Sequence, residues 1–168
     1  MNDDSLINIF IVEDDEVFLK TLSHHLHQVK KYKISTFSSG EDCLAKMSRN
    51  PDIVVLDLNL KGMTGLETLK KIRQTKNDTY VIICSEQEDI QTTLDVLKEG
   101  AYEYIIKNEN SATRIKNSIS HIIKSEEIKN ENLELRLKVS KYQLYIGAIA
   151  LVVAIAGFFT WWFNLRER

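Results

Sequence analysis

Residues with ionisable or hydroxyl side chains follow four separate apolar stretches of this chain. Glu13 and Asp14 come after one stretch, and Asp57, Ser85 and Lys107 each come after another. Three carboxylates that lie close together cannot all stay charged unless a cation joins them. Oxygen ligands of this kind suit Mg²⁺, a hard ion that often shares its coordination shell with phosphate. A carboxylate, a divalent cation, an ammonium group and a hydroxyl group are the components of phosphoryl transfer onto an aspartate, with the carboxylate as nucleophile.

These residues come together if the apolar stretches are neighbouring strands of one parallel sheet. Residues 53–56 are four consecutive apolar residues, three of them β-branched, which is typical of a strand buried on both faces. The carboxyl ends of such strands meet at one edge of the sheet, where ligands bind. Strand and helix patterns alternate five times along the chain, which predicts a doubly wound α/β domain with a five-stranded parallel sheet. The other strands are expected at residues 6–12, 34–37, 80–84 and 102–106.

Two further expectations concern the interior of this domain. A helix is expected from Cys43 through Leu44 and Met47 to Asn50, ended by Pro51. Cys43 and Cys84 each sit in an apolar context without metal-ligand spacing, so we expect two reduced, buried thiols. The acidic N-terminus lacks the apolar region of a signal peptide.

The joint pattern resembles the receiver domain of two-component response regulators. The resemblance covers roughly residues 5–125. It implies the flavodoxin-like receiver fold, a bound Mg²⁺, and a phosphoryl group taken from a histidine kinase or phosphotransfer protein. It also implies that the protein is a phospho-acceptor whose only intrinsic activities are self-phosphorylation and dephosphorylation. Such a protein is not primarily an enzyme. The matching elements, in the family's order, are Ile11-Val12-Glu13-Asp14, Val55-Leu56-Asp57-Leu58-Asn59, Gly62-Met63-Thr64-Gly65, Ser85, Gly100-Ala101-Tyr102-Glu103-Tyr104 and Lys107.

The resemblance also implies a metal site around the phospho-acceptor, which would be Asp57. Glu13 and Asp14 look like the acidic pair that holds Mg²⁺, with Asp14 as the direct ligand. Asn59 would offer its backbone carbonyl to the metal. Asp15 falls one position later and is expected to be an acid at a helix N-terminus.

Three more residues receive roles from the same resemblance. Ser85 and Lys107 would contact the oxygens of the phosphoryl group. Tyr104 matches the aromatic residue that changes rotamer as the hydroxyl residue moves inward. Ser85 and Tyr104 together would therefore form the switch that reports phosphorylation.

The sequence departs from the family pattern at three positions. Lys61 stands where the family usually has Pro, which predicts a looser loop after Asp57. Asn108 stands where Pro usually follows the Lys, so Lys107 could be held differently. Glu86 adds a carboxylate beside Ser85, where it could repel phosphate. These departures favour an alternative function, in which an unphosphorylated receiver-like adaptor tethers a partner at the membrane.

The charge of the chain is distributed unevenly. Residues 1–110 carry 13 Lys and Arg against 19 Asp and Glu, whereas residues 111–168 carry 9 against 5. Phosphate contacts need clustered Lys and Arg, so the acidic part predicts no nucleic-acid partner. Output through protein–protein interaction is expected instead.

Residues 126–141 follow the receiver-like region and contain neither Gly nor Pro. We expect a helical linker here, and both a parallel coiled coil with a homodimer and a single solvated helix remain open. In a heptad frame, one core position holds Ile119, Glu126, Leu133 and Ser140, and the other holds Ile123, Asn130, Leu137 and Leu144.

A transmembrane helix is predicted at residues 142–163, followed by a short tail at 164–168. No charged residue occurs from Leu144 to Phe163, a length that spans about 30 Å as a helix. Tyr and Trp residues stand at its two ends, as in an aromatic belt. The flanking basic residues favour a single-pass protein with a cytoplasmic receiver; they are Arg136, Lys138 and Lys141 on one side and Arg166 and Arg168 on the other.

Overall fold

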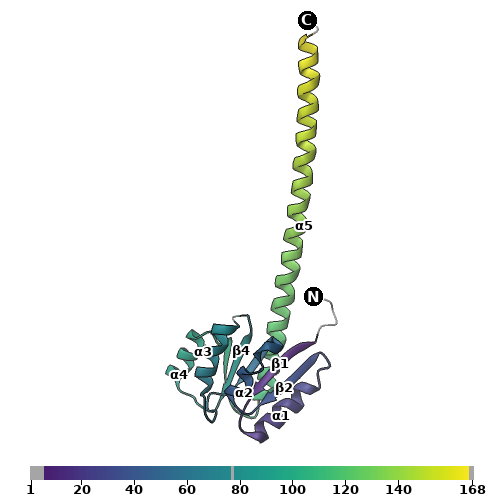
Figure 1. The fold of residues 1–168 in the computed structure, drawn as a ribbon. Coiled ribbons are helices and arrows are strands. Elements are labelled where there is room, and N and C mark those ends of the chain that lie inside the picture. The colour runs from purple at the N-terminus through teal and green to yellow at the C-terminus, as the bar shows by residue number, and fades with distance from the viewer. Residues whose placement is uncertain (1–5, 77, 167–168) are drawn as a thin grey trace. The chain divides into compact units, whose positions relative to one another are not determined.

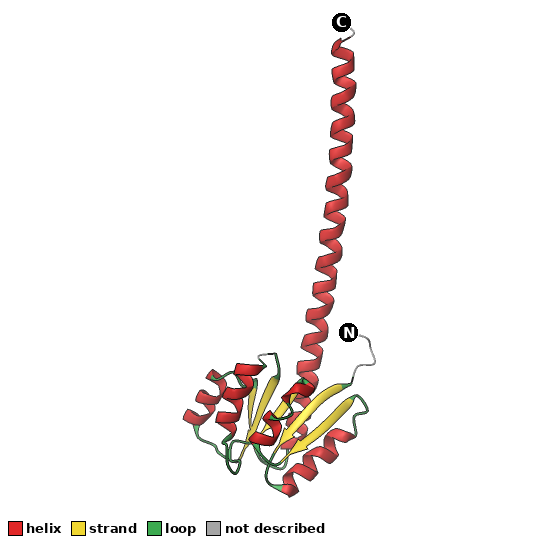
Figure 2. Cartoon of the chain, viewed as in Figure 1, coloured by secondary structure: helices red, strands yellow, loops and turns green. Residues whose placement is uncertain are grey.

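The computed structural model describes residues 6–76 and 78–166. Five strands form one sheet in the order β2-β1-β3-β4-β5, and each neighbouring pair is parallel (Figure 1). The predicted doubly wound α/β fold with a five-stranded parallel sheet is confirmed. The strands are Ile7–Val12 (β1), Tyr32–Phe37 (β2), Ile53–Leu56 (β3), Tyr80–Ser85 (β4) and Glu103–Ile106 (β5). The helices are Glu16–His27 (α1), Gly40–Leu44 (α2), Gly65–Thr75 (α3), Ile90–Lys98 (α4) and Ser111–Arg166 (α5), shown in red in Figure 2.

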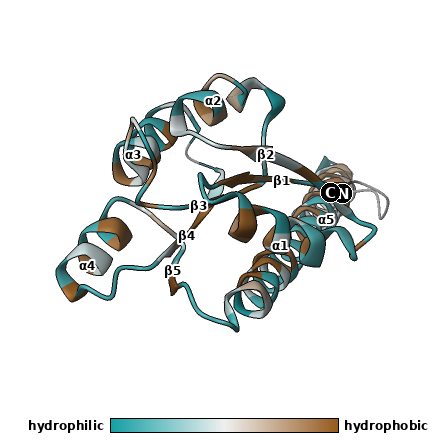
Figure 3. Cartoon of the chain, turned by 90° about the horizontal axis from the view of Figure 1, so that it is seen from below, coloured by the Kyte–Doolittle hydropathy of each residue, from teal (hydrophilic) through white to brown (hydrophobic). Residues whose placement is uncertain are grey.

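Helices cover both faces of the sheet (Figure 3). In β1, Ile9 and Ile11 pack in one core cluster with residues of α1 and of the beginning of α5. Phe10 and Val12 pack in a second cluster with residues of α2, α3 and α4. Successive side chains of a strand point to opposite faces, so a strand covered on both sides must be apolar throughout. The continuous apolar stretches of the sequence are explained by this arrangement.

The helix expected from Cys43 to Asn50 is shorter than predicted. α2 ends at Leu44, and a 3₁₀ turn at Met47–Arg49 completes the connection to β3. Asn50 adopts φ of 51°, in the left-handed region that Asn tolerates better than most residues. Pro51 disfavours a helical conformation at the residue before it, and the backbone reverses into β3 at this point.

Cys43 and Cys84 are free and buried, one in each core cluster. Burial in apolar surroundings raises the pKa of both thiols to about 12. The predicted burial of both thiols is confirmed.

α5 belongs to two parts of the chain, which divides into residues 1–123 and residues 124–168. Within the first part, Ile115, Ile119 and Ile122 are buried in the core beside the sheet. The side chain of Ile119 is therefore buried in the receiver core. It cannot contribute to a helix–helix interface between two chains.

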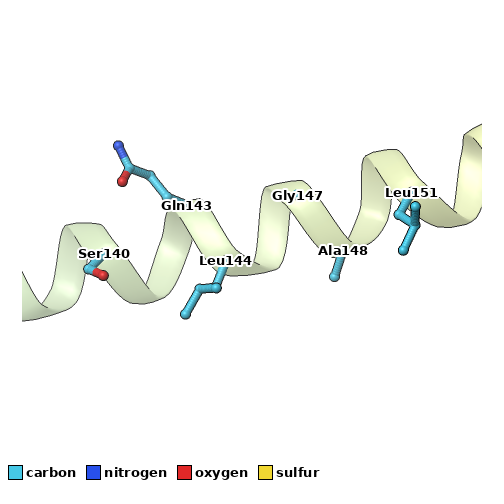
Figure 4. Close-up of a pocket in the computed structure, with 6 residues that line it drawn as sticks. All are labelled: Ser140, Gln143, Leu144, Gly147, Ala148 and Leu151. Carbon is cyan, nitrogen blue, oxygen red and sulfur yellow. The ribbon is translucent and has the colours of Figure 1, made fainter.

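Residues 124–166 by themselves form one helical segment. By length and composition, this helix is apolar enough to cross a bilayer. A shallow hollow beside Gly147 is formed by one helix alone, and its lining is shown in Figure 4: Ser140, Gln143, Leu144, Gly147, Ala148 and Leu151. Ser5, at the predicted start of the receiver, and Glu167 and Arg168 of the predicted tail lie outside the described residues.

Candidate functional site

Three carboxylates meet at the carboxyl edge of the sheet. Glu13 and Asp14 follow β1, and Asp57 follows β3, which pairs directly with β1. The backbone N–H of Asp57 donates to the carbonyl of Val12 at 3.0 Å, which fixes the two strand ends side by side. One oxygen from each carboxylate lies within 4.8 Å of the others, and Glu13 and Asp57 are buried. The structure therefore gathers these acids into one cluster.

The ammonium of Lys107 reaches into this cluster from the end of β5. Its Nζ lies 2.9 Å from Oδ2 of Asp57 and 2.8 Å from Oε2 of Glu13. The same Nζ stands 4.8 Å from the centre of the Phe18 ring on α1, a cation–π contact. The Lys107 side chain is only 10% exposed, so its charge is held inside the site by these partners.

Burial and crowding change the ionisation of the cluster. Desolvation, with a smaller contribution from the charge of Asp57, raises the pKa of Glu13 from 4.5 to about 7, against the opposing effect of Lys107. For Lys107, desolvation alone would lower the pKa, but hydrogen bonds to Glu13 and Asp57 outweigh it and raise the pKa above its ordinary value. Keeping the buried carboxylates ionised therefore costs free energy, and the ammonium of Lys107 reduces this cost.

Ser85 and Tyr104 lie on the neighbouring strands β4 and β5. Ser85 is the last residue of β4 and is fully buried. The hydroxyl of Tyr104 donates to the carbonyl of Gln87 at 2.6 Å, and the N–H of Gln87 donates to Oγ of Ser85 at 3.5 Å. Burial raises the pKa of Tyr104, and a hydrogen bond with Ser85 works against this rise. The two residues are thus connected through the β4–α4 loop.

The loop after Asp57 closes tightly over the strand end. The backbone N–H of Asn59 donates to Oδ1 of Asp57 at 3.2 Å. A Cβ at Gly65 would lie 2.0 Å from the carbonyl oxygen of Asp57, so only glycine fits there. The N–H of Met63 donates to Oε1 of Glu41 at 2.9 Å, which fixes the loop to α2.

The residues that depart from the family pattern have defined surroundings. Lys61 Nζ lies 3.3 Å from Oδ2 of Asp14. The N–H of Asn108 donates to Oγ of Ser111 at 2.6 Å, and the described residues contain no cis peptide bond. Glu86 is exposed. Lys107 reaches the acids with Asn108 in this position.

Two contacts of the site were missed at the level of sequence. Phe18 is an apolar residue of α1, and its residue type alone does not indicate that its ring faces Lys107. The looser loop predicted at Lys61 rests only on the absence of Pro. The cationic side chain four residues after Asp57 already indicated a contact with the acids of the site. The N-terminal acid of α1 was predicted: Oδ1 of Asp15 accepts from the N–H of Val17 at 2.8 Å and of Phe18 at 3.3 Å.

The donor set fits a magnesium ion. Carboxylate oxygens at one strand edge are ligands that Mg²⁺ prefers, and it binds through a few of them while keeping waters and phosphate oxygens. The three carboxylates lie within 4.8 Å of one another, and the buried ammonium of Lys107 contacts Glu13 and Asp57 and leaves Asp14 to other cations. Glu13, Asp14 and Asp57 could therefore hold the ion.

Comparison with known proteins agrees with this geometry. Residues 9–120 match the family model of the response regulator receiver domain. The chain belongs to this family. Its fold is the CheY-like α/β fold, and the activated DrrB receiver domain with BeF3 superposes with a TM-score of 0.66 at 28% identity, covering 71% of this chain and 98% of that one. The CheX–CheY–BeF3–Mg²⁺ complex from Borrelia burgdorferi matches with a TM-score of 0.62 at 28% identity, covering 68% and 87% of the two chains.

Relatives of this receiver carry it within longer proteins. A protein-glutamate methylesterase/protein-glutamine glutaminase of Trichodesmium erythraeum is 36% identical over 112 residues, which are 64% of this chain and 32% of the relative. The transcriptional regulatory protein AfsQ1 of Streptomyces coelicolor is 30% identical over 101 residues, 60% of this chain and 44% of the relative. The receiver chain thus spans less than half the length of either protein.

Proposed function

We propose that this receiver accepts a phosphoryl group on Asp57 from a histidine kinase or a phosphotransfer protein. The observation that carries the proposal is the position of the Asp57 carboxylate. It is buried at the end of β3, within the acid cluster, and Lys107 donates to its Oδ2 at 2.9 Å. A buried carboxylate held in this way is oriented for attack on phosphorus.

In the transfer, an oxygen of Asp57 forms a bond to phosphorus. The bond from phosphorus to the donor nitrogen of phosphohistidine breaks, and its electron pair stays on the imidazole. The ammonium of Lys107 neutralises charge on the equatorial oxygens, and the hydroxyl of Ser85 donates to one of them. Hydrolysis of the acyl phosphate later restores the free carboxylate, so the protein is a phospho-acceptor and not primarily an enzyme.

Mg²⁺ is part of the proposal. The carboxylates of Glu13, Asp14 and Asp57 and the backbone carbonyl of Asn59 would hold it. When bound, the ion would neutralise further charge on the phosphoryl oxygens.

Phosphorylation is proposed to be read out by a protein partner. Tyr104 would change rotamer as Ser85 moves toward the phosphoryl group, releasing its hydrogen bond to Gln87. Ile90, Leu94 and Leu97 on α4 are exposed apolar residues near β5 in sequence, and they offer a surface for docking.

We further propose that residues 142–163 anchor the receiver at the cytoplasmic side of a membrane, in a single pass. The support is the apolar, exposed helical segment with aromatic and basic residues at its ends. The heptad pattern of residues 126–141 supports a homodimer next to the membrane.

The test uses the full chain in detergent micelles with MgCl₂ and acetyl phosphate. We expect the intact mass to increase by one phosphoryl group, and chelation of Mg²⁺ to prevent this. Asp57→Asn is the matched control and should remain unmodified. A wild-type chain that stays unmodified at saturating phosphodonor would contradict the proposal.

The Lys61–Asp14 ion pair favours a second function, the unphosphorylated adaptor, because a side chain already compensates one acid of the cluster. Partner capture from membranes by the wild type and by Asp57→Ala separates the two. Equal capture with and without beryllofluoride supports the adaptor, whereas capture that depends on beryllofluoride and on Asp57 supports the switch.

A further inference from the structure

We propose that Lys61 sets the Mg²⁺ affinity of the receiver, acting as a tethered cation that competes with the metal for Asp14. The inference rests on the proposed function of the acid cluster as a magnesium site. It assigns a role to a side chain that the family pattern does not contain.

The geometry that supports this role is the pairing of charges in the cluster. Lys107 compensates Glu13 and Asp57, with its Nζ within 2.9 Å of both. Lys61 compensates the third acid, because its Nζ lies 3.3 Å from Oδ2 of Asp14. Each of the three carboxylates therefore has an ammonium partner.

The backbone around Lys61 keeps its ammonium near Asp14. Leu60, the preceding residue, is buried in the core. On the other side of Lys61, the N–H of Met63 donates to Oε1 of Glu41. Gly62, between them, adopts φ of 86°, a conformation that glycine accepts without strain. A long side chain on a loop fixed at both sides returns to the same carboxylate, which raises its effective concentration there.

The two ammonium groups differ in how they can respond to a metal ion. The Lys107 side chain is 10% exposed and is enclosed by its partners, whereas the Lys61 side chain is 87% exposed. Mg²⁺ needs direct contact with a carboxylate oxygen at about 2.0–2.1 Å. When the ion approaches Asp14, Lys61 can withdraw into water and Lys107 cannot. The Lys61 pair is therefore the part of the cluster that opens on metal binding.

Exposure also sets the size of the effect. Exposed ion pairs are weak and are screened by salt. Removing the positive charge of Lys61 should therefore tighten Mg²⁺ binding by about twofold to fivefold, which corresponds to at most about 1 kcal/mol. The difference should shrink as the salt concentration rises.

The experiment is a calorimetric titration of MgCl₂ into the full chain in detergent micelles, at low and at high NaCl. The variants are Lys61→Gln and Lys61→Arg. Lys33→Gln is the matched control, because Lys33 is exposed near the amino end of β2, at the opposite edge of the sheet. We expect Lys61→Gln to bind Mg²⁺ more tightly at low salt, with Lys61→Arg and Lys33→Gln close to the wild type.

The other outcomes overturn the inference. If the wild type binds Mg²⁺ and Lys61→Gln binds it equally or less tightly, Lys61 does not compete with the metal, and the proposed function stands. If Lys33→Gln tightens binding as much as Lys61→Gln, the effect is one of net charge and not of the pair. If neither the wild type nor Lys61→Gln takes up Mg²⁺, the inference and the magnesium site both fail.

Discussion

At the scale of single residues, burial makes the ionised form of Glu13 unfavourable in the folded protein. Its pKa is raised to about 7 by burial, although Lys107 donates a hydrogen bond to it. In the unfolded chain the same group loses its proton near pH 4.5. Between these two values the folded state binds more protons than the unfolded state. Stability contributed by this group is therefore lost as the pH rises through the window.

The corresponding prediction concerns Glu13→Gln in the presence of a chelator. Gln carries no charge at any pH, so the variant should gain stability relative to the wild type as the pH rises from about 5 to about 8, by on the order of 3 kcal/mol. Urea unfolding at several pH values in micelles measures this difference. Glu109→Gln, which changes an exposed carboxylate outside the cluster, serves as the control. A constant difference between Glu13→Gln and the wild type across this range would refute the prediction.

At the scale of elements, α5 changes its surroundings along its length. In its first turns, Ile119 is fully buried in the core, and the hydroxyl of Ser118 donates to Glu103 of β5. Beyond residue 123 the large apolar side chains are exposed; Ile128 is 50% exposed. An isoleucine on α5 thus stabilises the receiver core when it precedes residue 123, and it contributes little to that core when it follows.

Alanine substitutions measure these two roles. Ile119→Ala removes buried methyl groups and leaves a cavity, so it should destabilise the receiver by about 2–5 kcal/mol. Ile128→Ala is the matched control and should change stability by less than about 0.5 kcal/mol. The free energy of receiver unfolding, followed by hydrogen exchange of the β-strand amides, compares them. Similar effects of the two substitutions would show that the boundary within α5 is misplaced.

At the scale of the whole molecule, the chain combines a receiver with an apolar helical segment. The receiver has its own core of two clusters, one on each face of the sheet. The segment of residues 124–166 has exposed apolar side chains that water alone would solvate poorly. A bilayer would provide apolar surroundings for the proposed membrane anchor at residues 142–163.

Charge placed in the middle of the segment tests this assignment. Each Arg at the centre of a span costs about 2.5–3.5 kcal/mol, so the double variant Ala150→Arg, Ala154→Arg should lose most of its resistance to carbonate extraction from membranes. Leu133→Arg, Leu137→Arg has the same spacing on an exposed part of α5 outside the span, and it should remain with the membrane fraction. A wild-type chain that is itself extracted by carbonate would contradict membrane insertion.

The sequence by itself determined the fold and the position of the acids along the chain. Apolar stretches such as residues 53–56 are typical of strands covered on both faces, and the residues after such strands share one edge of a parallel sheet. Local signals also placed Asp15 at the N-terminus of α1. They were less accurate between Cys43 and Pro51, where apolar spacing suggested a longer helix than the backbone forms.

Only the tertiary structure decided how the charges of the site are paired. The contact of Lys61 with Asp14, the position of Phe18 beside Lys107 and the burial that raises the pKa of Glu13 join residues far apart in the chain. Such contacts depend on strand register, loop closure and the direction of long side chains, which residue types alone do not specify. The same holds for α5, because a helical pattern continues across residue 123 while the sheet that buries its first turns does not.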